Sequence, residues 1–199
     1  MPRCFHFGYR RKIGLLGGSF NPAHEGHLAL SEKARKMARC DEIWWLVSPQ
    51  NPLKTSKNMA DFQTRLSFAR EFAKGKSWLR VVDIEQTAGT SKSVDVMKLL
   101  KSRAGKSQFI WLMGSDNLRQ LPLWHEAKTL AHLMPFMVFR RETDFYPSLE
   151  SKGRYLFGRT GRVKKAASLF QKNPPCLYLD SAFYQPVSST QIRAKGAWQ

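Results

Sequence analysis

The stretch Gly17-Gly18-Ser19-Phe20-Asn21-Pro22-Ala23-His24-Glu25-Gly26-His27-Leu28 decides the fold of this 199-residue chain. An apolar run over 13–16 leads into it, and a run suited to a helix, 29–39, follows it. A strand, a tight glycine turn and the start of a helix together direct backbone N–H groups at one small volume. His24 and His27 share one helix face, so both imidazoles can reach the same ligand. The stretch predicts a binding site for the phosphates of a nucleotide.

Apolar runs alternate with helical patterns along the rest of the chain. The sequence predicts strands at 12–18, 41–48, 78–84, 108–113, 135–140 and 176–180. It predicts helices at 25–39, 61–74, 93–103 and 123–133, a short helix at 161–171 and a capped helix start at 188–193. Residues 85–92 are predicted as a polar loop and 114–117 as a turn. This alternation indicates βαβ units and a mostly parallel sheet, in which ligands bind beyond the carboxyl ends of the strands.

Composition limits the classes of protein to which the chain can belong. Hydrophobic residues make up 42% and the net charge is +18, so we expect a globular protein that attracts phosphate in a nucleotide, RNA, DNA or an anionic lipid. A solvated basic surface would explain the same charge. Cys4, Cys40 and Cys176 are few and far apart, which argues against a disulfide framework and favours a reducing, cytoplasmic location. No apolar run approaches the roughly 20 residues of a membrane helix.

The length predicts a single domain over residues 1–199. Within it, 1–11 is a basic N-terminal extension and 141–175 a variable basic insertion. Residues 151–172 contain seven Lys or Arg and no acid. We interpret the insertion as a solvated segment, and a phosphate-facing surface or an RNA patch is the functional alternative.

The residue types of the glycine stretch fit phosphate chemistry. Gly17 and Gly18 let the backbone approach a ligand, and the residues after them present further N–H groups. The two histidines can donate charge-assisted hydrogen bonds to phosphate oxygens. A plain helix surface or a metal site is the alternative for such a pair of histidines. Zinc would need a third ligand, however, and none of His6, His125 and His132 fits the spacing of such a site.

Together these residues look like the signature of the nucleotidyltransferase superfamily that contains the (T/H)-x-G-H motif. The double glycine and the first histidine resemble nicotinate-nucleotide adenylyltransferases more than phosphopantetheine adenylyltransferases. Further landmarks follow in order: a proline loop over 48–54 ending in Lys54, Arg65 in the next helix, Trp111-Leu112-Met113-Gly114-Ser115-Asp116-Asn117-Leu118 with Trp124 after it, and Val187-Ser188-Ser189-Thr190-Gln191-Ile192-Arg193. The resemblance covers residues 12–196.

The resemblance implies an α/β fold, a Rossmann-like doubly wound, mostly parallel sheet flanked by helices. It implies an enzyme that transfers the adenylyl group of ATP to nicotinate mononucleotide in NAD biosynthesis, giving nicotinate adenine dinucleotide and pyrophosphate. ATP and a pyridine mononucleotide are therefore the expected partners. Mg²⁺ would be bound mainly through the ATP phosphates, with no metal site on the protein. A homo-oligomer is left open.

The family's roles transfer to the matching positions of this chain. The residues expected to act on the reacting phosphates are His24, His27, Lys54 and Arg193. Those expected to bind ATP are Gly17, Gly18, Ser19, Phe20, Gly26, Gly114, Asp116, Ser188, Ser189 and Thr190. Trp124 is expected to stack on the pyridine ring. Lys92 and Ser93 replace a Tyr-Thr pair that lies against the pyridine in the family, and Lys92 favours a nicotinate carboxylate.

Two other functions stay open at this point. The first keeps the reaction but uses nicotinamide mononucleotide or another phosphate monoester as the acceptor. The second is a non-catalytic, basic nucleic-acid-binding protein, which the net charge of +18 motivates. Outside the motifs, Asp83 and Glu85 are interpreted as loop residues in contact with solvent. Trp44, Trp45, Trp78 and Trp111 are interpreted as core residues, because they lie inside apolar runs.

Overall fold

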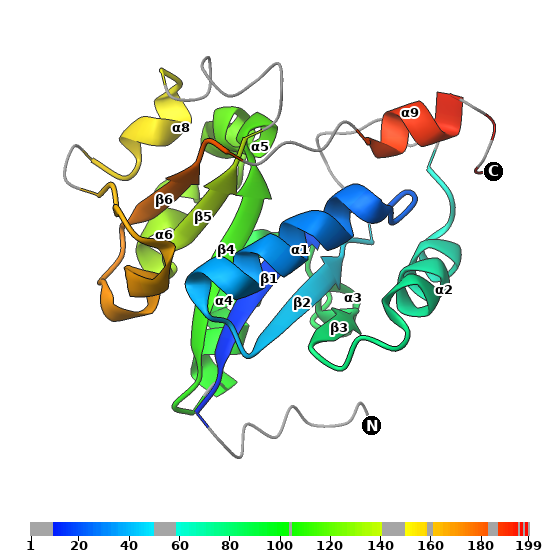
Figure 1. Ribbon diagram of the computed structural model, residues 1–199, viewed down its shortest axis with the longest axis horizontal. Coiled ribbons are helices and arrows are strands. Elements are labelled where there is room, and N and C mark those ends of the chain that lie inside the picture. Colours follow the sequence, from blue (N-terminus) through cyan, green and yellow to red (C-terminus); the bar gives the residue numbers. More distant parts are fainter. Residues whose placement is uncertain are drawn as a thin grey trace.

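The sheet at the centre of the protein has six parallel strands in the order β3-β2-β1-β4-β5-β6 (Figure 1). The computed structural model describes residues 10–49, 59–103, 105–140, 150–158, 161–182, 187–194, 196 and 198. The strands are β1 (Lys12–Gly18), β2 (Glu42–Val47), β3 (Leu79–Val82), β4 (Gln108–Gly114), β5 (Phe136–Phe139) and β6 (Leu177–Asp180). The strand order runs outward from β1 in both directions, so the order reverses between β1 and β4, where ligands bind in open sheets of this kind.

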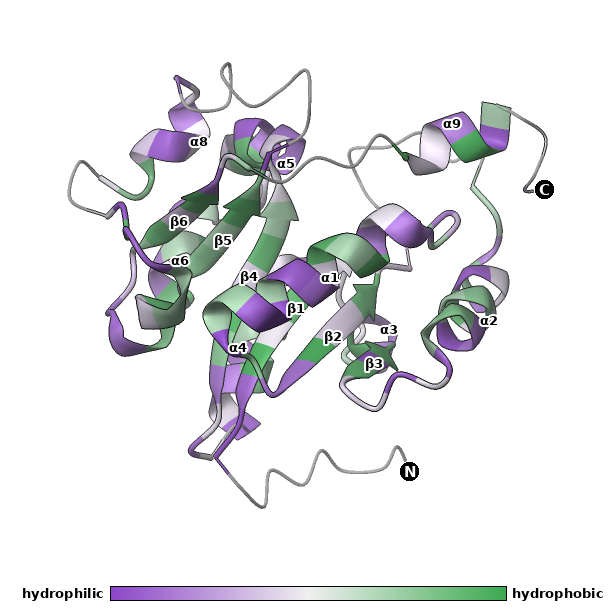
Figure 2. Ribbon diagram, viewed as in Figure 1, coloured by the Kyte–Doolittle hydropathy of each residue, from purple (hydrophilic) through white to green (hydrophobic). Residues whose placement is uncertain are grey.

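Helices cover both faces of this sheet. They are α1 (Glu25–Ala38), α2 (Phe62–Ala73), α3 (Ile84–Thr87), α4 (Ser93–Arg103), α5 (Ser115–Gln120), α6 (Ala127–Leu133), α8 (Lys152–Tyr155) and α9 (Ser189–Ala194), with the 3-10 helices η2 (Leu121–Leu123) and η3 (Ala166–Gln171). Alternate side chains of β2 point to opposite faces: Trp45 packs in the cluster that contains α1, α2 and η3, and Trp44 in the one that contains α4, α5 and α6. Figure 2 shows the central strands as mostly hydrophobic, as expected for a sheet buried on both faces.

The structure confirms the expected fold class, an α/β sheet wound with helices on both sides. The predicted strands and the predicted helices at 25–39, 61–74 and 93–103 agree with the observed elements to within three residues at their ends. Asp61 caps α2 as expected, since its Oδ1 accepts from Gln63 N at 2.8 Å. Among the described residues, no helix is long and apolar enough to cross a membrane.

Four local predictions were wrong. The segment 84–87 is a short helix rather than the end of a strand and a polar loop, 115–120 is a helix rather than a turn, and the helix predicted from 123 begins at Ala127. In the fourth case, the insertion is not simply solvated, because Phe157, Leu169 and Phe170 are buried in the two core clusters. Gly153 makes this packing possible, since a Cβ there would collide with the carbonyl oxygen of Leu118 in α5.

Candidate active site

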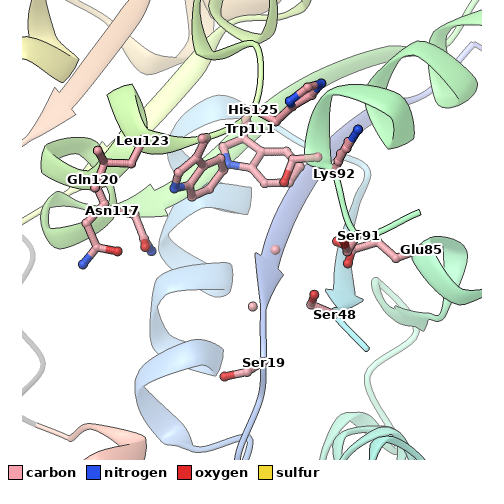
Figure 3. Close-up of a pocket in the computed structure, with 14 residues that line it drawn as sticks. Ser19, Ser48, Glu85, Ser91, Lys92, Trp111, Asn117, Gln120, Leu123 and His125 are labelled. Carbon is pink, nitrogen blue, oxygen red and sulfur yellow. The ribbon is translucent and has the colours of Figure 1, made fainter. Parts of the chain in front are cut away.

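A pocket of about 460 Å³ opens where the carboxyl ends of β1, β2 and β4 meet (Figure 3). This is the reversal point of the strand order, as the parallel sheet predicts. It is lined by Gly17, Gly18, Ser19, Ser48, Glu85, Ser91, Lys92, Ser93, Trp111, Asn117, Gln120, Leu123, Trp124 and His125. Six of these were expected at a site: the glycine turn with Ser19, the pair Lys92 and Ser93, and Trp124.

The glycine turn ends β1 at the floor of the pocket. Gly17 allows a close approach, because a Cβ on it would lie 2.8 Å from Cζ2 of Trp111 on the neighbouring strand. Phe20 follows in the left-handed region, with φ 45°, which is rare for a bulky residue. Its ring is buried and stacks on Trp45, with centroids 4.9 Å apart. Packing of this ring in the core therefore holds the turn in a strained conformation beneath the pocket.

The side chains of His24 and His27 together cap the N-terminus of α1. Nδ1 of His24 accepts from the N–H of Gly26 at 3.0 Å, and Nδ1 of His27 accepts from the N–H of His24 at 3.3 Å. Their ring centroids are 3.9 Å apart. Since Nδ1 is the acceptor in both rings, the neutral tautomer has its proton on Nε2. The cap thus fixes the two rings side by side with Nε2 as a donor, which suits an anionic ligand better than a cation.

The segment from Val187 onward packs on the loop that precedes α1. Ser189 Oγ donates to Pro22 O at 3.0 Å, and Arg193 donates to Asn21 O at 2.6 Å and to Thr190 Oγ1 at 3.3 Å. Figure 1 shows α9 beside the amino end of α1. The structure therefore brings Ser188, Ser189, Thr190 and Arg193 next to the histidine cap, although they are 161 or more positions away from it in sequence.

Arg65 is the hub that connects the glycine turn to the next two elements. Its side chain lies on α2, is 1% exposed, and donates four hydrogen bonds to backbone carbonyls: Ala60 at 2.9 Å, Ser19 at 2.6 Å, Ser48 at 2.8 Å and Pro49 at 2.8 Å. Sequence reasoning noted this residue only as a landmark of the family. A buried arginine on the inward face of an amphipathic helix was the available signal of a structural role.

The opposite wall of the pocket is aromatic. The Trp124 ring meets that of Trp111 edge to face, with centroids 6.3 Å apart. Trp111 is 1% exposed and so belongs to the core as expected, but it also lines the pocket. The flat ring of Trp124 beside a lysine at position 92 can hold an aromatic ring that bears a negative group. Residues that sequence reasoning did not place here are Ser48, Ser91, Asn117, Gln120, Leu123 and His125.

Glu85 is a correction to the sequence interpretation. It was expected in a solvent-exposed loop, but it is 4% exposed and lines the pocket from α3. Burial raises the pKa of its carboxyl to about 7, partly offset by a hydrogen bond from the Ser48 side chain. The error follows from the short helix α3, which turns the Glu85 side chain inward. The sequence pattern did not predict this helix.

The remaining expected residues lie around the pocket rather than in its lining. Gly114 ends β4 and caps α5, on which Asp116 is half-buried. Lys54 lies outside the described residues. In the described part of the chain, no three His, Cys, Asp or Glu side chains are grouped so that they could hold a metal ion.

The chain is similar to known proteins over nearly its whole length. Residues 15–195 match the family model described as cytidylyltransferase-like. The probable nicotinate-nucleotide adenylyltransferase of Parvibaculum lavamentivorans is 39% identical over 193 residues, covering 94% of this chain and 93% of that protein. That of Gluconobacter oxydans is 38% identical over 190 residues, covering 94% and 96%. In fold, the chain resembles the Plasmodium falciparum nicotinic acid mononucleotide adenylyltransferase complexed with NaAD, with a TM-score of 0.67, 20% identity, and coverage of 93% and 83%. The chain therefore belongs to the nicotinate-nucleotide adenylyltransferase family, within the cytidylyltransferase-like proteins.

Proposed function

We propose that this chain transfers the adenylyl group of ATP to nicotinate mononucleotide, giving nicotinate adenine dinucleotide and pyrophosphate in NAD biosynthesis. The family supports this activity. The observation that carries it in this chain is the meeting of the glycine turn, the mutually capped histidines and α9 at one edge of a pocket whose far wall is Trp124. One end is built for phosphates and the other for an aromatic ring.

The reaction needs positioning and charge neutralisation rather than a covalent intermediate. The phosphate of the mononucleotide attacks the α-phosphorus of ATP in line, and the bond to pyrophosphate breaks. In this proposal Nε2 of His24 and of His27 donate to the ATP phosphates as negative charge develops. The backbone of Gly17, Gly18, Ser19, Phe20 and Gly26 surrounds the same oxygens.

The other expected residues complete this proposal. Ser188, Ser189, Thr190 and Arg193 bind the outer phosphates from the α9 side, together with Lys54. Gly114 and Asp116 hold the adenosine, and Lys92, Ser93 and Trp124 the pyridine ring. Mg²⁺ bound through the ATP phosphates would neutralise charge on the leaving pyrophosphate. The hydroxyls, imidazoles and backbone N–H groups here are donors to phosphate oxygens, which fits a metal carried by the nucleotide.

Lys92 favours the nicotinate acceptor over the amide, because it is the one lysine or arginine among the described residues that line the pocket. The binding of nucleic acid has no comparable support in the described part of the chain. The buried thiols of Cys40 and Cys176, which are not paired, agree with a cytoplasmic location, which remains a prediction.

Release of pyrophosphate tests the proposal. The purified protein with ATP, Mg²⁺ and nicotinate mononucleotide should release it, with a higher kcat/KM than for nicotinamide mononucleotide. His27→Asn keeps an acceptor for the N–H of His24 but loses the Nε2 donor, so kcat should fall by about 100-fold. His132→Asn, on the exposed face of α6, is the matched control and should leave kcat unchanged. A wild-type protein that is inactive on both pyridine nucleotides would reject the proposal.

A further inference from the structure

The carboxyl group of Glu85 is a buried acid inside the pocket that the proposed mechanism does not use. Glu85 lies in the first turn of α3, directly after β3, and is 4% exposed. Figure 3 shows its side chain reaching from α3 toward the middle of the pocket, between Ser48 and Lys92. The position of the carboxyl is therefore that of a ligand contact rather than of a surface charge.

One oxygen of this carboxyl has no hydrogen-bond partner within the described part of the chain. The Ser48 side chain donates to the group, but Oε2 is buried and has no partner among the described residues. A buried acceptor with no donor is destabilising, and such groups in native proteins are rare. Burial also raises the pKa of Glu85 to about 7, as expected when the solvation lost is not replaced. The chain thus keeps an acceptor whose donor is expected to come from the ligand.

The location of Glu85 along the pocket shows which part of the ligand it would meet. Gly17, Gly18 and Ser19 form the phosphate end, and Trp124 with Lys92 forms the ring end. In Figure 3 the side chain of Glu85 lies between Ser19, at the first end, and Lys92, at the second. In a pyridine mononucleotide the group that joins the phosphate to the ring is the ribose.

We propose, on the basis of the proposed function, that Glu85 accepts hydrogen bonds from the ribose hydroxyls of the pyridine mononucleotide and so selects a ribonucleotide over its deoxy analogues. The hydroxyls are neutral donors, whereas the phosphate and the nicotinate carboxylate are anions that a second carboxylate would repel. Acidic side chains bind ribose hydroxyls in other nucleotide-binding α/β sheets, which is a general solution to the same problem. A role as general base is not needed, because the attacking phosphate is already an anion.

The test compares nicotinate mononucleotide with its 2′-deoxy and 3′-deoxy analogues by pyrophosphate release. The wild type should lose about 10- to 100-fold in kcat/KM when the hydroxyl bound by Glu85 is removed. Glu85→Ala should lose a similar factor on the ribonucleotide and should no longer distinguish it from that analogue. Glu85→Gln keeps an acceptor without the charge and should retain part of the discrimination, which decides the matter if the alanine variant does not fold.

Asp83→Ala is the matched control, because its carboxylate is two residues away and lies 3.6 Å from Arg70 outside the pocket. This control should discriminate as the wild type does. The inference is overturned if the wild type uses both deoxy analogues as well as the ribonucleotide, or if both Glu85 variants keep the full wild-type ratio. A wild type that is inactive on nicotinate mononucleotide itself would reject the proposed function and this inference with it, so the two failures are distinguishable.

Discussion

Replacement of Arg65 by Met should reveal how much of the phosphate site depends on one buried side chain. Methionine has a side chain of similar length but donates none of the four hydrogen bonds to the carbonyls of Ser19, Ser48, Pro49 and Ala60. A hydrogen bond from a charged donor contributes about 1.5–3 kcal/mol, but the four are not additive and the freed carbonyls can relax toward water. We therefore expect the free energy of unfolding to fall by about 3–5 kcal/mol.

Urea denaturation measures this loss, with Arg70→Met as the control. Arg70 lies on the same helix, but its side chain is 52% exposed and pairs with Asp83 at 3.6 Å, so we expect a change of no more than about 0.5 kcal/mol. Because the Ser19 carbonyl belongs to the glycine turn, Arg65→Met should also lower kcat/KM by about 10- to 100-fold under conditions in which the variant is folded. A loss of stability below about 1 kcal/mol would refute the interpretation of Arg65 as a hub.

Three further perturbations test other parts of the site. The carboxyl of Glu85 has its pKa raised from 4.5 to about 7, so the native state binds a proton more tightly than the unfolded state, and this contribution is lost as the pH rises through about 7. As the pH rises from 4.5 to just above 7, the free energy of unfolding of the wild type should fall by up to about 3 kcal/mol relative to that of Glu85→Gln. Equal pH profiles of the two proteins would contradict this. Gly17→Ala should place a methyl group against Trp111 and lower activity about 10-fold or more, and unchanged activity would show that this close approach is not needed. Trp198→Phe removes a 2.8 Å hydrogen bond to Asn21 Oδ1 but keeps an aromatic ring near Phe68, so the protein should stay folded while the KM for ATP rises several-fold. An unchanged KM would show that this bond does not position the loop that precedes α1.

The sequence by itself determined the sheet and one half of the site. Continuous apolar runs such as Ile43-Trp44-Trp45-Leu46-Val47 predict strands buried on both faces, and their alternation with helices leaves few alternatives to a parallel sheet. The glycine turn and the two histidines were found because the residues that mark them are continuous in the sequence. The cap of α1 involves only residues 24–27, so the contacts that hold both rings at the start of the helix lie within one turn of the chain.

Only the tertiary structure decided which distant residues complete the site. The carbonyls that Arg65 binds belong to three different segments, and α9 meets Pro22 across 167 positions of sequence. The burial of Glu85 could not be predicted from the sequence either. A carboxylate after a short strand is solvated in most proteins, and it is buried here because α3 turns it into a pocket whose walls come from β1, β4 and α4. Local pattern fixes which backbone conformation a segment adopts, but burial and pKa depend on the segments that pack against it, and these are brought together only by the fold.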